Sequence, residues 1–235
     1  MSSYTENLQR LRGAQKPGAG VPAYTRWINR RLARHVAAAA AALHITANGV
    51  TAISAVISLA GLITLVIAPV TWWSGLAVAA LLAAGYVLDS ADGQVARLTG
   101  TGGPAGEWLD HVVDAIRTPA IHLAVVVAVW AHTDYPLWLG GIAIAFALIA
   151  SGQFMSQILA EQLRAKTDRS VASSEGGGVV KSFLILPNDM GSLCWIFVLW
   201  GAIPAFAVAY TLLFAANSIH SIVSMRRKFL GLRKP

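Results

Sequence analysis

Long apolar segments recur along the 235-residue chain, and they constrain its fold more than any other feature. Each is about 20 residues long, enough for a helix rising ~1.5 Å per residue to cross a ~30 Å hydrocarbon layer. Only 12% of the residues are charged, against about a quarter in soluble domains, so lipid must surround most of the chain. The segments lack the alternating pattern of a membrane barrel, which leaves helices to pair the backbone. We therefore predict an all-α membrane protein with six transmembrane helices, at residues 47–68, 74–97, 107–131, 137–162, 183–203 and 205–225.

The net charge of +7 could indicate nucleic-acid binding, but the positions of the basic residues indicate membrane topology instead. Lys and Arg gather before the first predicted span, between the fourth and fifth, and after the sixth. The alternate connections, residues 69–73, 131–136 and 201–204, contain none. Because cytoplasmic loops are enriched in these residues, we predict a cell (inner) membrane protein with both termini and the active site cytoplasmic. Interfacial tryptophans should mark the basic-free ends: Trp72, Trp73, Trp130, Trp138 and Trp200.

The N-terminal part of the chain carries an amphipathic pattern before the first span. Residues 23–35 place Tyr24, Trp27, Ile28 and Leu32 at helical spacing opposite several arginines, as in a helix lying on the inner membrane surface. A solvated basic leader is the alternative interpretation. We predict a mobile cytoplasmic N-terminus, a membrane domain that includes this amphipathic interfacial helix, and a basic cytoplasmic tail, at residues 1–22, 23–228 and 229–235.

Four aspartates lie within or at the edge of the second and third predicted spans: Asp89, Asp92, Asp110 and Asp114. Carboxylates are costly in lipid, and there they usually mark a functional site that faces a polar cavity. The first two are three residues apart and the last two are four apart, so each pair shares one helix face. The chain reverses between the spans, and each pair lies roughly 6–12 Å from the turn. We therefore expect the four carboxylates to converge at one depth.

The expected cluster points to bound cations. Four carboxylates in a medium of low dielectric constant would repel one another or take up protons, and cations relieve both problems. Ligands that are all oxygen suit hard metals, and four carboxylates are enough for two ions. Because two-metal carboxylate sites often serve phosphoryl transfer, we predict a phosphotransferase with two divalent cations, Mg²⁺ or Mn²⁺. An ion or proton transporter is the alternative class for intramembrane acids.

Small and basic residues complete a longer pattern around the aspartates. The pattern DxxDGxxARx(8)GxxxDxxxD is matched at Asp89, Asp92, Gly93, Ala96, Arg97, Gly106, Asp110 and Asp114. At these positions the chain resembles the CDP-alcohol phosphotransferase (CDP-alcohol phosphatidyltransferase) family. The resemblance implies a six-helix fold, usually a homodimer, in which an alcohol attacks a CDP-linked substrate and CMP leaves. It further implies that Asp89, Asp92 and Asp110 are metal ligands, and that Asp114 is the catalytic general base that also contacts metal.

The same pattern implies a surface that binds the CDP group. Gly93 and Ala96 remove side-chain bulk, so that a ligand can approach the backbone of the helix. Arg97 supplies a planar guanidinium suited to a diphosphate. We predict that these three residues contact CDP.

A shorter resemblance lies at the start of the first span. Residues 46–51, TANGVT, are similar to the TPNxxT element of the family, with Ala47 in the place of proline. Asn48 and Thr51 are therefore candidate contacts to the cytidine end of CDP. Helix capping by Thr46 and Asn48 is the alternative explanation.

The acceptor site is less specified by the sequence. Family members that use a phosphorylated acceptor often carry Lys or Arg directly after the last aspartate, where this chain has Ala115. Candidate acceptor contacts are Arg117, Arg164 and Lys181, although the positive-inside rule explains the last two equally well. The segment around Asn188 and Asp189 could also contribute.

The expected reaction follows from these sites. We expect transfer of phosphatidyl from CDP-diacylglycerol to an alcohol acceptor in phospholipid biosynthesis. The alternative is a small CDP-alcohol that donates its head group to a lipid or glycan hydroxyl. Membrane lipids are the expected partners, and nucleic acid is not.

Overall fold

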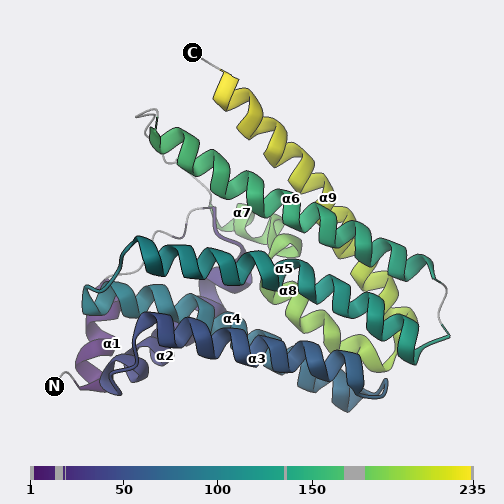
Figure 1. Cartoon of the computed structure of the whole chain (residues 1–235), viewed down its shortest axis with the longest axis horizontal. Coiled ribbons are helices and arrows are strands. Elements are labelled where there is room, and N and C mark those ends of the chain that lie inside the picture. The colour runs from purple at the N-terminus through teal and green to yellow at the C-terminus, as the bar shows by residue number, and fades with distance from the viewer. Residues whose placement is uncertain (1–2, 14–17, 19, 135–136, 167–177, 234–235) are drawn as a thin grey trace.

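The computed structural model describes residues 3–13, 18, 20–134, 137–166 and 178–233, and this part of the chain contains helices and no strand. Figure 1 shows α3, α4 and α5 lying side by side, with α6 and α9 inclined to them. The elements, in chain order, are α1 (Tyr4–Gly13), the π-helix η1 (Thr25–Asn29), α2 (Arg30–Ala42), α3 (Ala47–Ile67), α4 (Trp72–Thr99), α5 (Pro104–His132), α6 (Trp138–Lys166), α7 (Val179–Leu184), the 3-10 helix η2 (Leu186–Asn188), α8 (Met190–Trp195), the 3-10 helix η3 (Ile196–Gly201) and α9 (Ile203–Arg233).

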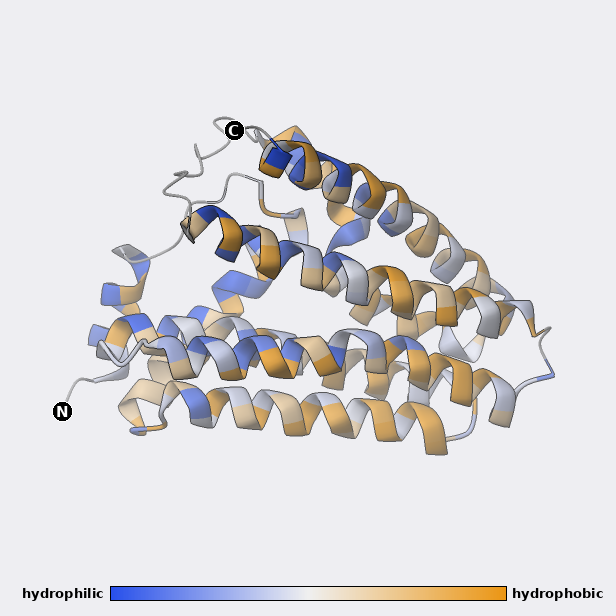
Figure 2. Cartoon of the chain, turned by 45° about the horizontal axis from the view of Figure 1, so that its top comes forward, coloured by the Kyte–Doolittle hydropathy of each residue, from blue (hydrophilic) through white to orange (hydrophobic). Residues whose placement is uncertain are grey.

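The all-α membrane class is confirmed. In the described part of the chain five helices, α3, α4, α5, α6 and α9, are long and apolar enough to cross a membrane. Large apolar side chains stay exposed along them, as lipid contact requires, and Figure 2 shows hydrophobic residues dominating the end of the bundle away from the termini. The chain is therefore a multi-pass membrane protein.

The segment predicted as the fifth span, residues 183–203, is not one continuous helix. Pro187 lies in a 3-10 turn, and Asp189 begins the next helix as its N-cap, so the helical hydrogen bonds are interrupted between them. The apolar piece that follows, Met190–Gly201, is too short to cross a membrane alone. Its last residue packs against Trp72, so the broken segment still reaches the end of the bundle where α4 begins. Six crossings therefore stay a prediction.

An alanine-rich face fixes α2 against α4. Its small side chains are buried and allow the two helices to approach closely, packing against Val87, Ala91, Val95 and Leu98 of α4. Ile28 and Leu32 are exposed, as a lipid-facing side would be, although contact with a membrane surface stays a prediction. In the region predicted to be mobile, α1 packs on α2 through the buried Leu11, and its mobility stays untested.

One of the five predicted interfacial tryptophans is placed differently. Trp72, Trp73, Trp130 and Trp138 are exposed, whereas Trp200 is completely buried, so its assignment as an interfacial anchor is wrong. The cause is the close contact between η3 and α4, where Gly75 in the first turn of α4 lies against the Cβ of Trp200 and the backbone of Phe197. The ring then packs edge-on against a phenylalanine of α9, with centroids 5.0 Å apart.

Replacing Gly75 by alanine is expected to loosen this contact. An added Cβ would lie 2.4 Å from the carbonyl oxygen of Phe197, a backbone atom that cannot rotate away. Overpacking of this kind costs about 1–3 kcal/mol, and thermal unfolding in detergent measures it. Gly141→Ala is the matched control, because a Cβ there meets nothing within 4 Å. Equal stability of the two variants would contradict the packing described here.

Candidate active site

A tight turn between α4 and α5 sets the level of the aspartates. After α4 ends, Gly100 adopts a φ of 68°, the left-handed conformation that glycine reaches without a steric penalty. Pro104 then opens α5, where its missing N–H is harmless. The two helices leave the turn antiparallel, but each packs more closely against α3 than against the other. Long side chains bridge the two helices, as between Arg117 of α5 and Asp89 of α4.

Three of the four aspartates come together between α4 and α5. Asp89, Asp92 and Asp110 each have a carboxylate oxygen within 4.8 Å of the other two. Oxygens around a six-coordinate Mg²⁺ lie up to about 4.2 Å apart, so small side-chain shifts would let all three bind one ion. A donor set made only of oxygens fits a hard divalent cation.

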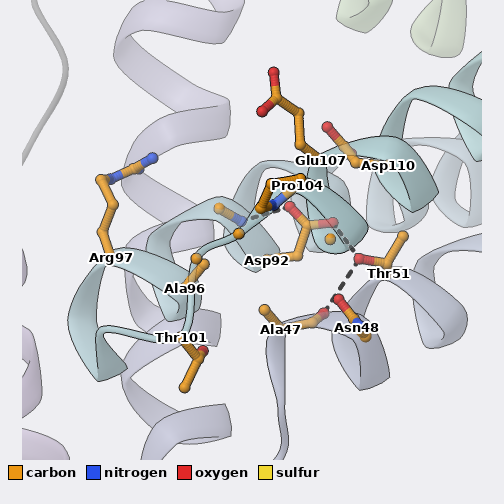
Figure 3. Close-up of a pocket in the computed structure, with 14 residues that line it drawn as sticks. Ala47, Asn48, Thr51, Asp92, Ala96, Arg97, Thr101, Pro104, Glu107 and Asp110 are labelled. Carbon is orange, nitrogen blue, oxygen red and sulfur yellow. Dashed lines mark hydrogen bonds between the residues drawn. The ribbon is translucent and has the colours of Figure 1, made fainter.

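Hydrogen bonds fix the most buried of these carboxylates. The Thr51 hydroxyl of α3 donates to Asp92 Oδ2 at 2.6 Å, and the Gly93 N–H donates to Oδ1 at 2.5 Å (Figure 3). Thr51 is held one turn into α3, which starts with Thr46 as its N-cap. The TANGVT element therefore contains a helix cap, at Thr46, and a residue that orients an aspartate, at Thr51.

Asp114, the fourth aspartate, is paired with an arginine. Arg117 Nη1 lies 2.6 Å from Asp89 Oδ1 and 3.2 Å from Asp114 Oδ1, while its Nη2 donates to the Ser54 hydroxyl of α3 at 2.8 Å. Arg117 is buried, and it links all three helices around the site. It was predicted as an acceptor contact; here it neutralises two carboxylates. Ser54 was not foreseen, because a serine in an apolar helix carries no signal of its partner.

A cavity of about 400 Å³ opens beside the aspartates. Asp92 and Asp110 form part of its wall, and the predicted CDP contacts Asn48, Thr51, Gly93, Ala96 and Arg97 all line it (Figure 3). The start of α5 completes it. A Cβ at Gly106 would lie 3.2 Å from Asn48 Oδ1, so the glycine leaves room for this side chain.

A second cavity, of about 230 Å³, lies against the same aspartates and shares Arg97 with the first. Its other wall comes from the N-terminal segment, through Thr25 and Arg30, neither of which the sequence analysis placed at the site. In the sequence, Arg30 is one of the basic residues before the first span and lies in the predicted amphipathic helix, and neither role places it at the site. Nothing in the local sequence shows that it folds back onto α4.

The remaining predicted acceptor residues line neither cavity. Arg164 lies beside Gly231 near the end of α9, and Lys181 lies on the short helix α7. Asp189 is buried and accepts hydrogen bonds from Thr25 and from its own helix, at Gly191 N.

The fold and the site define a helical membrane protein with an acidic cluster that borders two cavities. A model of the family described as CDP-alcohol phosphatidyltransferase matches residues 44–223, and the chain belongs to this family. The protein is therefore a transferase that acts on CDP-alcohols, from a family that typically depends on divalent metal. A search of curated proteins finds no match.

Removing the buried arginine is expected to destabilise the protein. Arg117→Met leaves Asp89 and Asp114 without their shared counter-charge, and a buried pair broken in this way typically costs about 3 kcal/mol. Thermal unfolding without added metal measures the loss. The double variant Arg117→Met/Asp114→Asn should recover part of it, because one of the two charges is removed.

Arg226→Met, at an exposed arginine of α9, is the control and should leave the unfolding temperature unchanged. If Arg117→Met unfolds at the same temperature as this control, the ion pairs do not stabilise the fold.

Proposed function

We propose that the protein transfers a phosphatidyl group from CDP-diacylglycerol to an alcohol acceptor and releases CMP. The observation that carries this proposal is the position of Asp92 and Asp110 on the border of a cavity lined by the predicted CDP contacts, with a carboxylate oxygen of Asp89 within 4.8 Å of theirs. The cavity is polar on the side of the carboxylates and opens at the turn between two apolar helices. A nucleotide linked to a lipid needs a polar surface for its diphosphate and an apolar surface for its acyl chains.

The aspartates would hold two divalent cations, Mg²⁺ or Mn²⁺. Asp89, Asp92 and Asp110 are the first ligands by position, and Asp114 lies close enough to the other three for their charges to interact. When bound, the cations neutralise the charge of the diphosphate. Thr51 keeps the carboxylate of Asp92 in place, because its hydroxyl donates to one of the two oxygens.

The chemical step needs a base near the acceptor hydroxyl. Asp114 accepts the proton of that hydroxyl, and the alcohol oxygen forms a bond to the phosphorus that carries the lipid. The bond from this phosphorus to the bridging oxygen breaks, and CMP leaves with the bonding electrons. Arg97 binds the diphosphate, and Gly93 and Ala96 let the nucleotide approach the backbone of α4.

The surroundings of the site fit a lipid substrate. The start of α3 and the turn between α4 and α5 lie at the end of the bundle where the positive-inside rule puts the cytoplasm. We propose an inner-membrane location with the active site cytoplasmic, and a homodimer as the assembly.

Of the three candidate acceptor contacts, Arg117 is the one that touches the aspartates.

The assignment of Asp114 as the base predicts a large loss of turnover in Asp114→Asn. The amide keeps the size of the side chain but accepts no proton, so CMP release should fall about 100-fold or more. Purified protein is assayed for CMP with a divalent cation, CDP-diacylglycerol and a panel of alcohols, and mass spectrometry of the lipid product identifies the acceptor.

Asp134→Asn, on the connection after α5 at the opposite end of the bundle, is the matched control and should keep full activity. Full turnover by Asp114→Asn would remove the base from the mechanism. Release of CMP only from a soluble CDP-alcohol would replace the proposed donor.

A further inference from the structure

The wall of the second cavity comes partly from outside the matched family region. The family match begins at residue 44, yet the 230 Å³ cavity beside the aspartates includes Thr25 and Arg30. Residues 25–29 form a single π-helical turn, in which the Arg30 N–H reaches back to the Thr25 carbonyl. Such turns are rare and frequently lie at functional sites.

A buried carboxylate fastens this turn to the start of α8. Asp189 Oδ2 accepts from the Thr25 N–H at 2.8 Å, and Asp189 Oδ1 accepts from the Thr25 hydroxyl at 2.7 Å. Asp189 is only 3% exposed, so these bonds form away from water and hold Thr25 firmly. The neighbouring residue, Tyr24, packs directly on Gly191, and a Cβ at Gly191 would overlap the Tyr24 ring.

Further hydrogen bonds fasten the turn along α4. Asn29 Nδ2 donates to the Ser90 hydroxyl at 2.5 Å and to the Tyr86 carbonyl at 3.3 Å. Gln94 Nε2 lies 3.4 Å from the Arg30 carbonyl oxygen. Ser90 and Gln94 both line the second cavity, so the backbone of Arg30 is fixed at the cavity wall.

The two arginines of this cavity lie close enough for their like charges to interact. Arg30 comes from α2 and Arg97 from α4, and the Arg97 side chain extends away from Thr51 and Asp92 in Figure 3. Arg30 is half-buried, and this burial lowers the pKa of its guanidinium from the ordinary value. When the aspartates bind cations, their charges are no longer available to balance the two guanidiniums. An anion between the guanidiniums would then offset their mutual repulsion and the hydration that they lose on burial.

We propose that Arg30 binds a phosphate group of a substrate in the second cavity, opposite Arg97. The planar guanidinium fork matches phosphate oxygens and binds them through paired hydrogen bonds. Thr25 and Asp189 are positioning residues, since they hold the turn that carries Arg30. This inference rests on the proposed function, which supplies two phosphate sources: the diphosphate of the CDP donor, and a phosphate ester on the acceptor alcohol.

The test compares two neighbouring arginines that differ in their surroundings. Arg30→Gln and Arg31→Gln remove the same charge one residue apart, but Arg31 is exposed and does not line the cavity. Steady-state CMP release gives the KM of CDP-diacylglycerol and of acceptors offered with and without phosphate, namely glycerol, inositol and their phosphate esters. Calorimetric titration with CDP in the presence of Mg²⁺ measures nucleotide binding without turnover.

Arg30→Gln should raise the KM of one phosphate-bearing substrate about tenfold, with a much smaller change in kcat, and Arg30→Lys should recover part of the loss. A parallel rise in donor KM and in the Kd of CDP assigns the contact to the diphosphate. A rise only for the phosphorylated acceptors assigns it to the acceptor. If Arg30→Gln matches Arg31→Gln in every constant, the inference is overturned. If the unaltered protein neither binds CDP nor releases CMP, the proposed function itself fails.

Discussion

Negative charges held between apolar helices are the constraint on which the rest of this structure depends. Asp89, Asp92 and Asp110 bring oxygens within 4.8 Å of one another, on two helices that are long and apolar enough to cross a membrane. Such a cluster is unfavourable unless donors and cations compensate it. The nearby polar groups are arranged accordingly: Thr51 donates to one carboxylate, and the guanidinium of Arg117 neutralises another.

The helical scaffold keeps the cluster at one level and leaves room beside it. The turn at Gly100 joins the end of α4 to the start of α5, and α3 packs against both helices. Cavities of about 400 and 230 Å³ open on the aspartates, and Arg97 borders both. A reaction that joins two substrates needs access for each, and under the proposed function the two cavities would supply it next to a single charged centre.

The sequence was sufficient to predict the positions of site residues wherever their spacing along one helix determines which face they share. Separations of three and four residues placed each aspartate pair on one helix face, and the predicted CDP contacts all line one cavity. Spacing places Arg117 within one helical turn of Asp114, but it could not show that Arg117 would also pair with Asp89 on another helix. It also could not foresee contacts between distant segments, such as Asp189 with Thr25 or the burial of Trp200, because these depend on tertiary packing.

The central claim, that these carboxylates bind divalent cations, is tested most directly by anomalous X-ray diffraction from crystals grown with Mn²⁺. The account predicts anomalous density for manganese among the oxygens of Asp89, Asp92 and Asp110, and its loss in Asp92→Asn. Crystals with no manganese at this position, in protein whose carboxylates face the same cavity, would contradict the account.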